Sequence, residues 1–203
     1  MHDLLCDTAA TEWEKTLSVW SMFADADLPW RPADPRGRGR SVHEQFVHQC
    51  VSEDGWFMRM LGIDLGRPAL PTPETRLAFI AHYAAASAAR LERLRAEPET
   101  WWSSEVRFFD VGRSRAWVVM RRLLHTAHHR GQLTAYLRAL GREAWSTYGP
   151  TADTGGLAVD GATTLYAYPD VDSLLAGEAA GGAKRALPAP PARALSERPL
   201  NGR

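Results

Sequence analysis

The chain has 203 residues, of which 45% are hydrophobic and 24% charged, the balance of an ordinary globular domain. Its 24 basic and 24 acidic residues cancel to a formal net charge of zero, so charge gives no reason to expect nucleic acid or an anionic membrane surface as a partner. No apolar run reaches the roughly 18 residues of a membrane span, and the first residues lack the pattern of a signal peptide, so we expect a cytoplasmic protein.

Hydrophobic residues spaced three and four apart predict four long helices. The first is expected over about residues 8–26, where tryptophans and other apolar residues recur on one face. The stretch LPWRPADPRGRGR, residues 28–40, then interrupts the pattern with three prolines and two glycines. A break of this composition predicts a loop between the first two helices.

Local start signals place the second and third helices. Ser41 and Glu44 form a capping box, in which the serine accepts from the backbone N–H of Glu44 and the glutamate reaches back. The second helix is therefore expected over residues 42–61, before a terminating glycine. Thr72, followed by a proline, is the expected N-cap of the third helix, which Pro98 ends.

The fourth helix follows a segment without helical period. Residues 99–113 are expected to be a connection with an extended piece. Ser114 is the expected cap of the fourth helix, which runs to Leu140 and ends at Gly141. Four amphipathic helices without a convincing strand pattern predict an all-α fold, a four-helix bundle in which the long connections allow crossover topology.

The composition changes after the fourth helix and suggests three parts. Residues 1–145 are expected to form the bundle, and residues 146–175 an irregular extension that packs on it. In residues 176–203, alanine, glycine, proline and arginine dominate, which predicts a disordered tail.

Three histidines lie within five positions of the fourth helix, in LLHTAHHRGQL. Residues four apart lie about 40° from each other around a helix, so His125 and His129 can place their imidazoles on one ion. His128 faces a different direction. Two histidines on one turn do not make a metal site, because zinc takes at least three protein ligands in a catalytic site. The alternative is that the pair only forms hydrogen bonds inside the bundle.

A third ligand has to come from another helix, where His2, His43, His48 and His82 are available. His43 lies in the first, exposed turn of its helix, and His82 fits a core histidine with a satisfied nitrogen. The segment HEQFVH, residues 43–48, lacks the spacing of four between histidines that a zincin metalloprotease requires. The residue pattern leaves the third ligand open.

A capped helix with a histidine, SVHEQFVHQCVSEDGWF, followed by HxxHHRGQL on the last long helix, resembles the DinB/YfiT-like superfamily of bacterial metal-binding four-helix bundles. The resemblance covers roughly residues 8–142. It implies that the metal ligands are His48, His125 and His129. It also implies a homodimer, and a divalent metal for which zinc is the first expectation, with nickel or iron as alternatives.

Relatives in this superfamily include transferases and isomerases that depend on mycothiol or bacillithiol, and the N-terminal part of some iron-dependent sulfur-inserting enzymes. The resemblance implies that this chain takes a small-molecule substrate and uses such a thiol as co-substrate in an S-transferase or isomerase reaction. The alternatives are a non-enzymatic, stress-related metal-binding bundle and a metal-dependent hydrolase. No residue is assigned as the catalytic acid or base.

Three further residues near the expected site each have two interpretations. Gln132, three residues after His129, can orient that ligand or form a hydrogen bond on the helix surface. Arg130 can hold an anionic substrate or form a salt bridge. Glu53 can act as an acid or base, but it lies about 140° around the helix from His48, which favours a structural role. If imidazoles bind the metal, its affinity is expected to fall below about pH 6.

Overall fold

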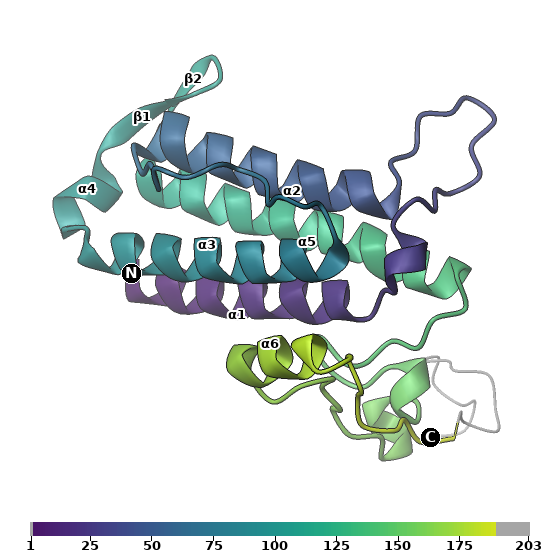
Figure 1. Cartoon of the computed structure of the whole chain (residues 1–203). Helices are drawn as coiled ribbons and strands as arrows, with labels where there is room; N and C mark the ends of the chain where they lie inside the picture. Colours follow the sequence, from purple (N-terminus) through teal and green to yellow (C-terminus); the bar gives the residue numbers. More distant parts are fainter. Residues whose placement is uncertain (1, 190–203) are drawn as a thin grey trace.

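The computed structural model describes residues 2–189 and consists of four long helices with a smaller layer packed against them (Figure 1). The bundle contains α1 (His2–Ser21), α2 (Val42–Trp56), α3 (Arg76–Ala96) and α5 (Arg115–Ala139). The shorter elements are α4 (Glu99–Ser103), β1 (Glu105–Phe108), β2 (Val111–Ser114) and α6 (Val171–Ala179). The expected all-α fold is confirmed. Every helix within residues 2–189 is too short or too polar to span a lipid bilayer.

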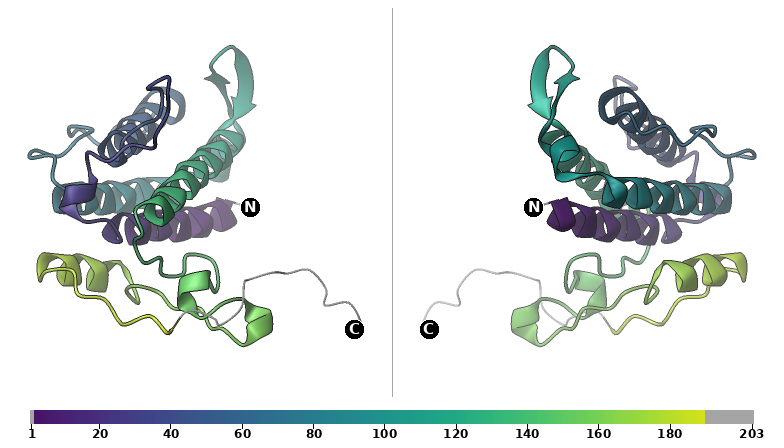
Figure 2. Two further views of the ribbon diagram at one scale, coloured as in Figure 1. Left: turned by 90° about the vertical axis from the view of Figure 1, so that its right-hand side faces the viewer. Right: turned by 90° about the vertical axis from the view of Figure 1, so that its left-hand side faces the viewer.

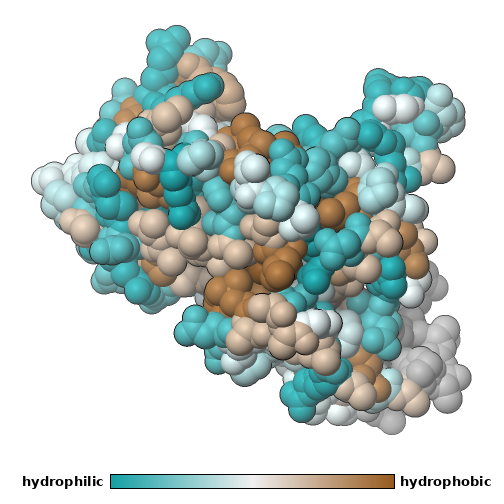
Figure 3. All heavy atoms as spheres, in the orientation of Figure 1, coloured by the Kyte–Doolittle hydropathy of each residue, from teal (hydrophilic) through white to brown (hydrophobic). Residues whose placement is uncertain are grey.

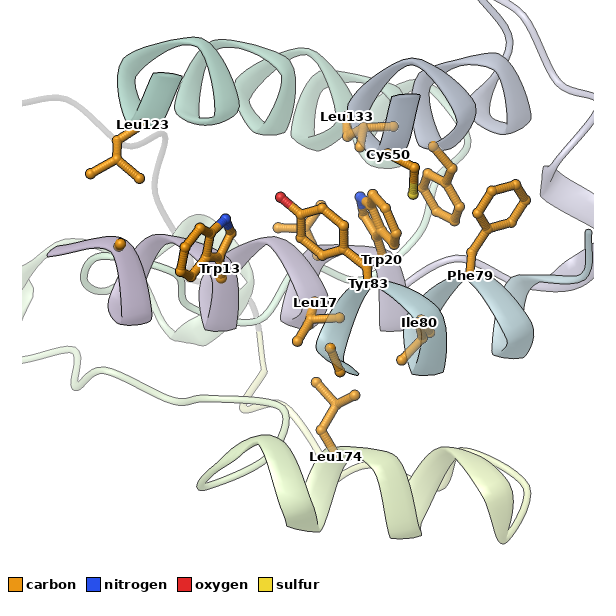
Figure 4. Close-up of a cluster of buried hydrophobic side chains, with 14 of the residues drawn as sticks. Trp13, Leu17, Trp20, Cys50, Phe79, Ile80, Tyr83, Leu123, Leu133 and Leu174 are labelled. Carbon is orange, nitrogen blue, oxygen red and sulfur yellow. The ribbon is translucent and has the colours of Figure 1, made fainter. Parts of the chain in front are cut away.

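Apolar side chains from all four bundle helices meet in one core (Figure 4). On α1, Trp13, Leu17 and Trp20 recur at intervals of three and four and are at most 2% exposed. The Trp20 ring stacks on Phe46 of α2 with 4.2 Å between centroids, and lies 4.7 Å from the ring of Tyr83 on α3. Burying each such side chain contributes on the order of 2–3 kcal/mol, so this stack holds three helices together.

The predicted second helix is confirmed at both ends. The Ser41 hydroxyl accepts from the backbone N–H of Glu44 at 3.1 Å, and the Glu44 carboxylate accepts from the backbone N–H of Ser41 at 2.7 Å. After α2 the chain continues into one π-helical segment, Phe57–Leu61. This segment ends at Gly62, whose φ of 74° lies in the left-handed region, a conformation that glycine adopts at little energetic cost.

The first and third helices differ from the prediction at their ends. α1 covers His2–Ser21, whereas residues 8–26 were expected. Beyond Ser21 the chain leaves the helix, and the Asp27 carboxylate accepts from the backbone N–H of Ala24 at 2.7 Å. The expected cap at Thr72 is wrong. That residue precedes a cis proline, and the N-cap of α3 is a second threonine three positions on, Thr75, which accepts from the backbone N–H of Ala78.

The segment before α5 contains more structure than expected. Residues 99–113 form α4 and most of an antiparallel hairpin, in which Phe108 pairs with Val111. Each strand has four residues, which is too short for an alternation of polar and apolar residues to distinguish a strand from a loop in the sequence. The predicted cap is confirmed, since the Ser114 hydroxyl accepts from the backbone N–H of Trp117 at 3.2 Å.

The residues after α5 form a second layer on the far side of α1 and α3 from α2 (Figure 2). Apolar residues gather where α6 meets the bundle (Figure 3), and Leu174 joins the core. α6 crosses the expected boundary at residue 175, so the start of the predicted tail is helical. This helix was not predicted, because the composition of the segment resembles that of a disordered tail. Its N-cap is Asp170, whose side chain accepts from the backbone N–H of Ser173 at 2.7 Å. Residues 190–203 of the predicted disordered tail lie outside the described residues.

Candidate metal centre

Two neighbouring helices bring three histidines together. His48 comes from α2, and His125 and His129 come from α5. One ring nitrogen of each lies within 4.8 Å of the others. The ring centroid of His48 lies 5.6 Å from that of His125 and 4.5 Å from that of His129. We refer to these three residues as the histidine site; they are the three ligands that the family resemblance implied.

The spacing of the nitrogens suits a single ion. The Nε2 atoms of His125 and His129 are 3.1 Å apart. Two nitrogens that are each about 2.0–2.1 Å from one ion, and roughly 100° apart at it, lie about 3.1 Å from each other. The ring of His48 makes no hydrogen bond with any of the residues 2–189, so its nitrogens are available as a third ligand.

Two glutamines orient His129. Its Nδ1 lies 3.0 Å from Oε1 of Gln45 and 2.9 Å from Oε1 of Gln132. Amide oxygens only accept, so Nδ1 carries the hydrogen and donates to them, which leaves the lone pair on Nε2 free for a metal. Gln132 makes the contact considered from the sequence. Gln45 was missed, although its position three residues before His48 places the two on one face of α2.

The surroundings of His125 are less simple. Its Nδ1 lies 2.9 Å from Nη1 of Arg122, which can only donate, so in this arrangement the ring hydrogen is on Nε2 and faces His129. Binding a metal through Nε2 therefore requires a change of tautomer. The change turns an N–H of His125 towards Nη1 of Arg122, so that contact has to lengthen, while Nη1 can keep its hydrogen bond to Ser52 at 2.9 Å. The indole of Trp56 stacks on the His125 ring at 5.7 Å and fixes its plane. With the new tautomer and this longer contact, the donor set fits a divalent ion.

Burial keeps the three imidazoles neutral. Desolvation, with the nearby charges of Arg40 and Arg122, lowers the pKa of His48 to about 4. Desolvation and Arg122 lower the pKa of His125 to about 3, and desolvation and His48 lower that of His129 to about 4. Neutral imidazole is the form that binds metal. Protons should therefore compete with a metal only well below the pH of about 6 expected from the sequence.

The four other histidines lie outside the site and contact other groups. Their contacts are His128 with Gln132, His43 with Glu74, His82 with the carbonyl of Ala69, and His2 with Glu99. His82 is thus the satisfied histidine that its position in the sequence suggested.

The structure does not bring Arg130 to the histidine site. Its side chain is 2% exposed and points towards α1, where Nη1 donates to the backbone carbonyl of Glu12 at 2.9 Å. Nη2 forms an ion pair with the Glu12 carboxylate and contacts the hydroxyl of Tyr148. Arg130 therefore joins α5 to α1 and to the C-terminal layer, as in the salt-bridge interpretation.

Glu53 occupies a separate, fully buried cluster. Its carboxylate accepts from five side chains, and we call these six residues the Glu53 cluster: Glu53 with Trp13, Tyr83, Arg90, Arg122 and Thr126. A carboxylate with so many internal donors, and no exposure to solvent, has a structural role. Arg122 belongs to this cluster and also contacts His125, which links the two groups.

A pocket of about 650 Å³ opens beside His48. Its floor includes Val47 and Val51 of α2. Other lining residues come from the loop that rises from the bundle before α2 (Figure 1), which we call the arginine loop, residues 28–40. One ligand of the histidine site therefore faces a space that a small molecule could enter, which we call the His48 pocket.

Comparison with known proteins relates the chain and its fold to one family. A profile described as DinB family matches residues 4–155. A DinB-like protein from Bacillus cereus has a TM-score of 0.62 and 20% identity, covering 71% of this chain and 95% of that chain. A DinB-like protein from Bacillus subtilis has a TM-score of 0.53 and 12% identity, and the match covers 70% of this chain and 94% of that chain. At these identities the two structures show the fold alone. No curated protein matches the chain.

Proposed function

The chain belongs to the DinB family, and we propose that it binds one divalent metal ion at the histidine site and transfers a low-molecular-weight thiol to an electrophilic small molecule. The observation that carries the catalytic part is the His48 pocket. A structural metal site is closed by protein ligands, whereas a catalytic site keeps a position open towards its substrate. An opening beside one of three ligands favours the second kind.

The donor set supports a metal with Lewis-acid chemistry. Imidazole suits zinc, nickel and iron, and we propose zinc first. His48, His125 and His129 would hold such an ion with neutral ligands, and the ion would then supply Lewis acidity that lowers the pKa of a thiol. Desolvation lowers the pKa values of the three histidines, so the rings are neutral at pH 7, the form of imidazole that binds metal.

The chain's own residues position the reactants. The glutamine pair holds His129 and the Trp56 indole holds His125, so the nitrogens keep their directions. Val47 and Val51 give the pocket an apolar wall for the carbon part of a substrate. In the reaction that we propose, the thiol proton goes to water and the sulfur electron pair forms a new C–S bond. The bond from that carbon to its leaving group breaks, and the leaving group keeps the pair.

The test is a thiol-transfer assay on the full-length, zinc-loaded chain. Mycothiol or bacillithiol is mixed with monobromobimane, and the thioether is quantified by mass spectrometry. We expect a rate at least about tenfold above the reaction without protein, a modest acceleration for an enzyme. The rate should be lost in His48→Ala and kept in His128→Asn, whose histidine lies outside the site.

Stoichiometric zinc without thioether formation for either thiol would contradict the transfer reaction. In that case the non-enzymatic metal-binding bundle becomes the better account of the same residues. We also propose the homodimer that the family resemblance implies. Light scattering should then give twice the chain mass of 22.5 kDa, and the mass of one chain would contradict it.

A further inference from the structure

The arginine loop places positive charge over the His48 pocket. Three of its arginines, Arg31, Arg38 and Arg40, line the pocket together with His48 itself. In Figure 3 this loop is a hydrophilic projection at the upper right, standing clear of the bundle surface. Its charge therefore faces the same space as one metal ligand.

The acidic side chains that line the pocket are already occupied. Nη2 of Arg31 lies 2.8 Å from Oε1 of Glu44, the residue of the capping box. Nε2 of His43 lies 2.7 Å from Oε2 of Glu74. Neither carboxylate is paired with another cation of the pocket. The remaining charge of the pocket is therefore positive.

That remaining charge belongs to Arg38 and Arg40. Among residues 2–189, neither guanidinium has an acidic partner or a hydrogen-bond acceptor. Arg40 is close enough to His48 for its charge to act on that imidazole. Arg36 provides a contrast in the same loop, since its Nε lies 3.4 Å from the Asp34 carboxylate and it does not line the pocket.

Hydrogen bonds hold the loop in shape. The Asp34 carboxylate accepts from the backbone N–H groups of Arg36 at 2.9 Å and Arg38 at 3.1 Å. At the base of the loop, the backbone N–H of Val42 donates to the carbonyl of Trp30 at 3.0 Å. A loop that is already ordered loses little entropy when its arginines bind a ligand.

We propose that Arg38 and Arg40 bind an anionic group of the substrate, a carboxylate or a phosphate, while the thiol end of the same molecule reaches the histidine site. This inference rests on the proposed function. Guanidinium groups match the oxygens of both anions with paired hydrogen bonds. Val47 and Val51 line the same pocket and provide apolar surface for the carbon part of such a molecule. The substrate class is therefore a thiol with an anionic tail.

The experiment uses the zinc-loaded full chain and ω-mercaptocarboxylates with three to eight carbons, each paired with its neutral amide. Binding is measured by titration calorimetry, and the thiol contact by the sulfur charge-transfer band of the cobalt-loaded chain. At the best linker length, the acid should bind about tenfold more tightly than its amide, the gain expected of two partly exposed ion pairs. Arg38→Gln combined with Arg40→Gln should remove this preference and leave amide binding unchanged. Arg36→Gln is the matched control and should keep the preference.

Equal binding of acids and amides at every length, or a preference that survives the double substitution, would overturn the anion site. Succinate, which has no sulfur, is titrated in parallel to separate the two proposals. If succinate binds and the double substitution abolishes its binding while no thiol binds, the anion site stands and the thiol-transfer proposal fails. If thiols bind but succinate does not, and acids show no preference, only the anion site is wrong.

Discussion

Two polar clusters lie between α2 and α5, little more than a helical turn apart, and they are satisfied in different ways. In the Glu53 cluster, one buried carboxylate accepts from five side chains, two of them arginines. In the histidine site, three neutral rings converge with no acidic partner, and His48 makes no hydrogen bond within the described residues. The first cluster is complete within the protein. The second leaves the ring nitrogens of His48 without a partner among residues 2–189.

The contrast shows how a buried polar group can be assigned a role. Burial of a polar group is by itself a poor guide, because the fully buried Glu53 carboxylate is accounted for by its neighbours. In the histidine site, Gln45 and Gln132 orient His129 so that its Nε2 faces Nε2 of His125 at 3.1 Å. A buried side chain that is held in a fixed orientation, but whose polar atom has no partner in the protein, is a candidate ligand and not only a packing residue.

The largest expected effect comes from Glu53→Gln. The change leaves Arg90 and Arg122 buried without their shared countercharge, which should lower the free energy of unfolding by about 3–5 kcal/mol. Urea unfolding followed by circular dichroism measures the loss. Glu92→Gln, an exposed position on α3, is the control and should stay within about 0.5 kcal/mol of the wild type. A loss as small as the control's would show that the Glu53 cluster is not structural.

A smaller effect is expected on the other cluster from Gln132→Leu. Removing the amide oxygen takes away an acceptor for the His129 N–H, which should weaken metal binding by about 10- to 100-fold. Gln132→Glu keeps an acceptor at the same place and should retain the affinity. Competition with a chromophoric chelator measures both variants. Equal weakening by leucine and glutamate would rule out the orienting hydrogen bond.

The smallest effect on metal affinity is expected on moving from pH 7 to pH 5. The folded pKa values, about 4 for His48 and His129 and about 3 for His125, lie below the ordinary 6.5. Metal affinity should therefore stay nearly constant down to pH 5 and fall below pH 4. Over the same range the unfolded chain binds more protons than the folded one, so the stability of the metal-free chain should decrease as the pH falls below 6.5. Metal affinity that already falls steeply between pH 6.5 and 5 would contradict the burial of the site.

Local signals in the sequence predicted most of the bundle, and non-local contacts explain what was missed. The capping box at Ser41 and the cap at Ser114 depend only on neighbouring residues, and both are confirmed. Thr72 failed because a second threonine nearby offers the same chemistry. α6 was missed because it is stabilised by contacts with α1 and α3, whereas its composition resembles that of a tail.

In the histidine site, too, local signals predicted some residues, and non-local contacts explain the others. Helical spacing is sufficient to pair His125 with His129, whereas His48 was named only through the family resemblance, because periodicity does not tell which helices pack together. Arg130 follows His129 directly in sequence, yet it faces α1, since adjacent residues on a helix point about 100° apart. Gln45 had a usable signal, its spacing of three from His48, once that histidine was taken as a ligand.

The central claim is that the histidine site holds a metal, and metal content tests it most directly. Untagged protein is purified without chelators and measured by mass spectrometry, beside His48→Ala, His125→Ala and the control His128→Ala. The account predicts about one equivalent of divalent metal in the wild type and in the control, with loss in the other two variants while circular dichroism shows the fold intact. A wild type without metal under zinc-replete conditions, or metal that stays in His48→Ala and His125→Ala, would contradict it.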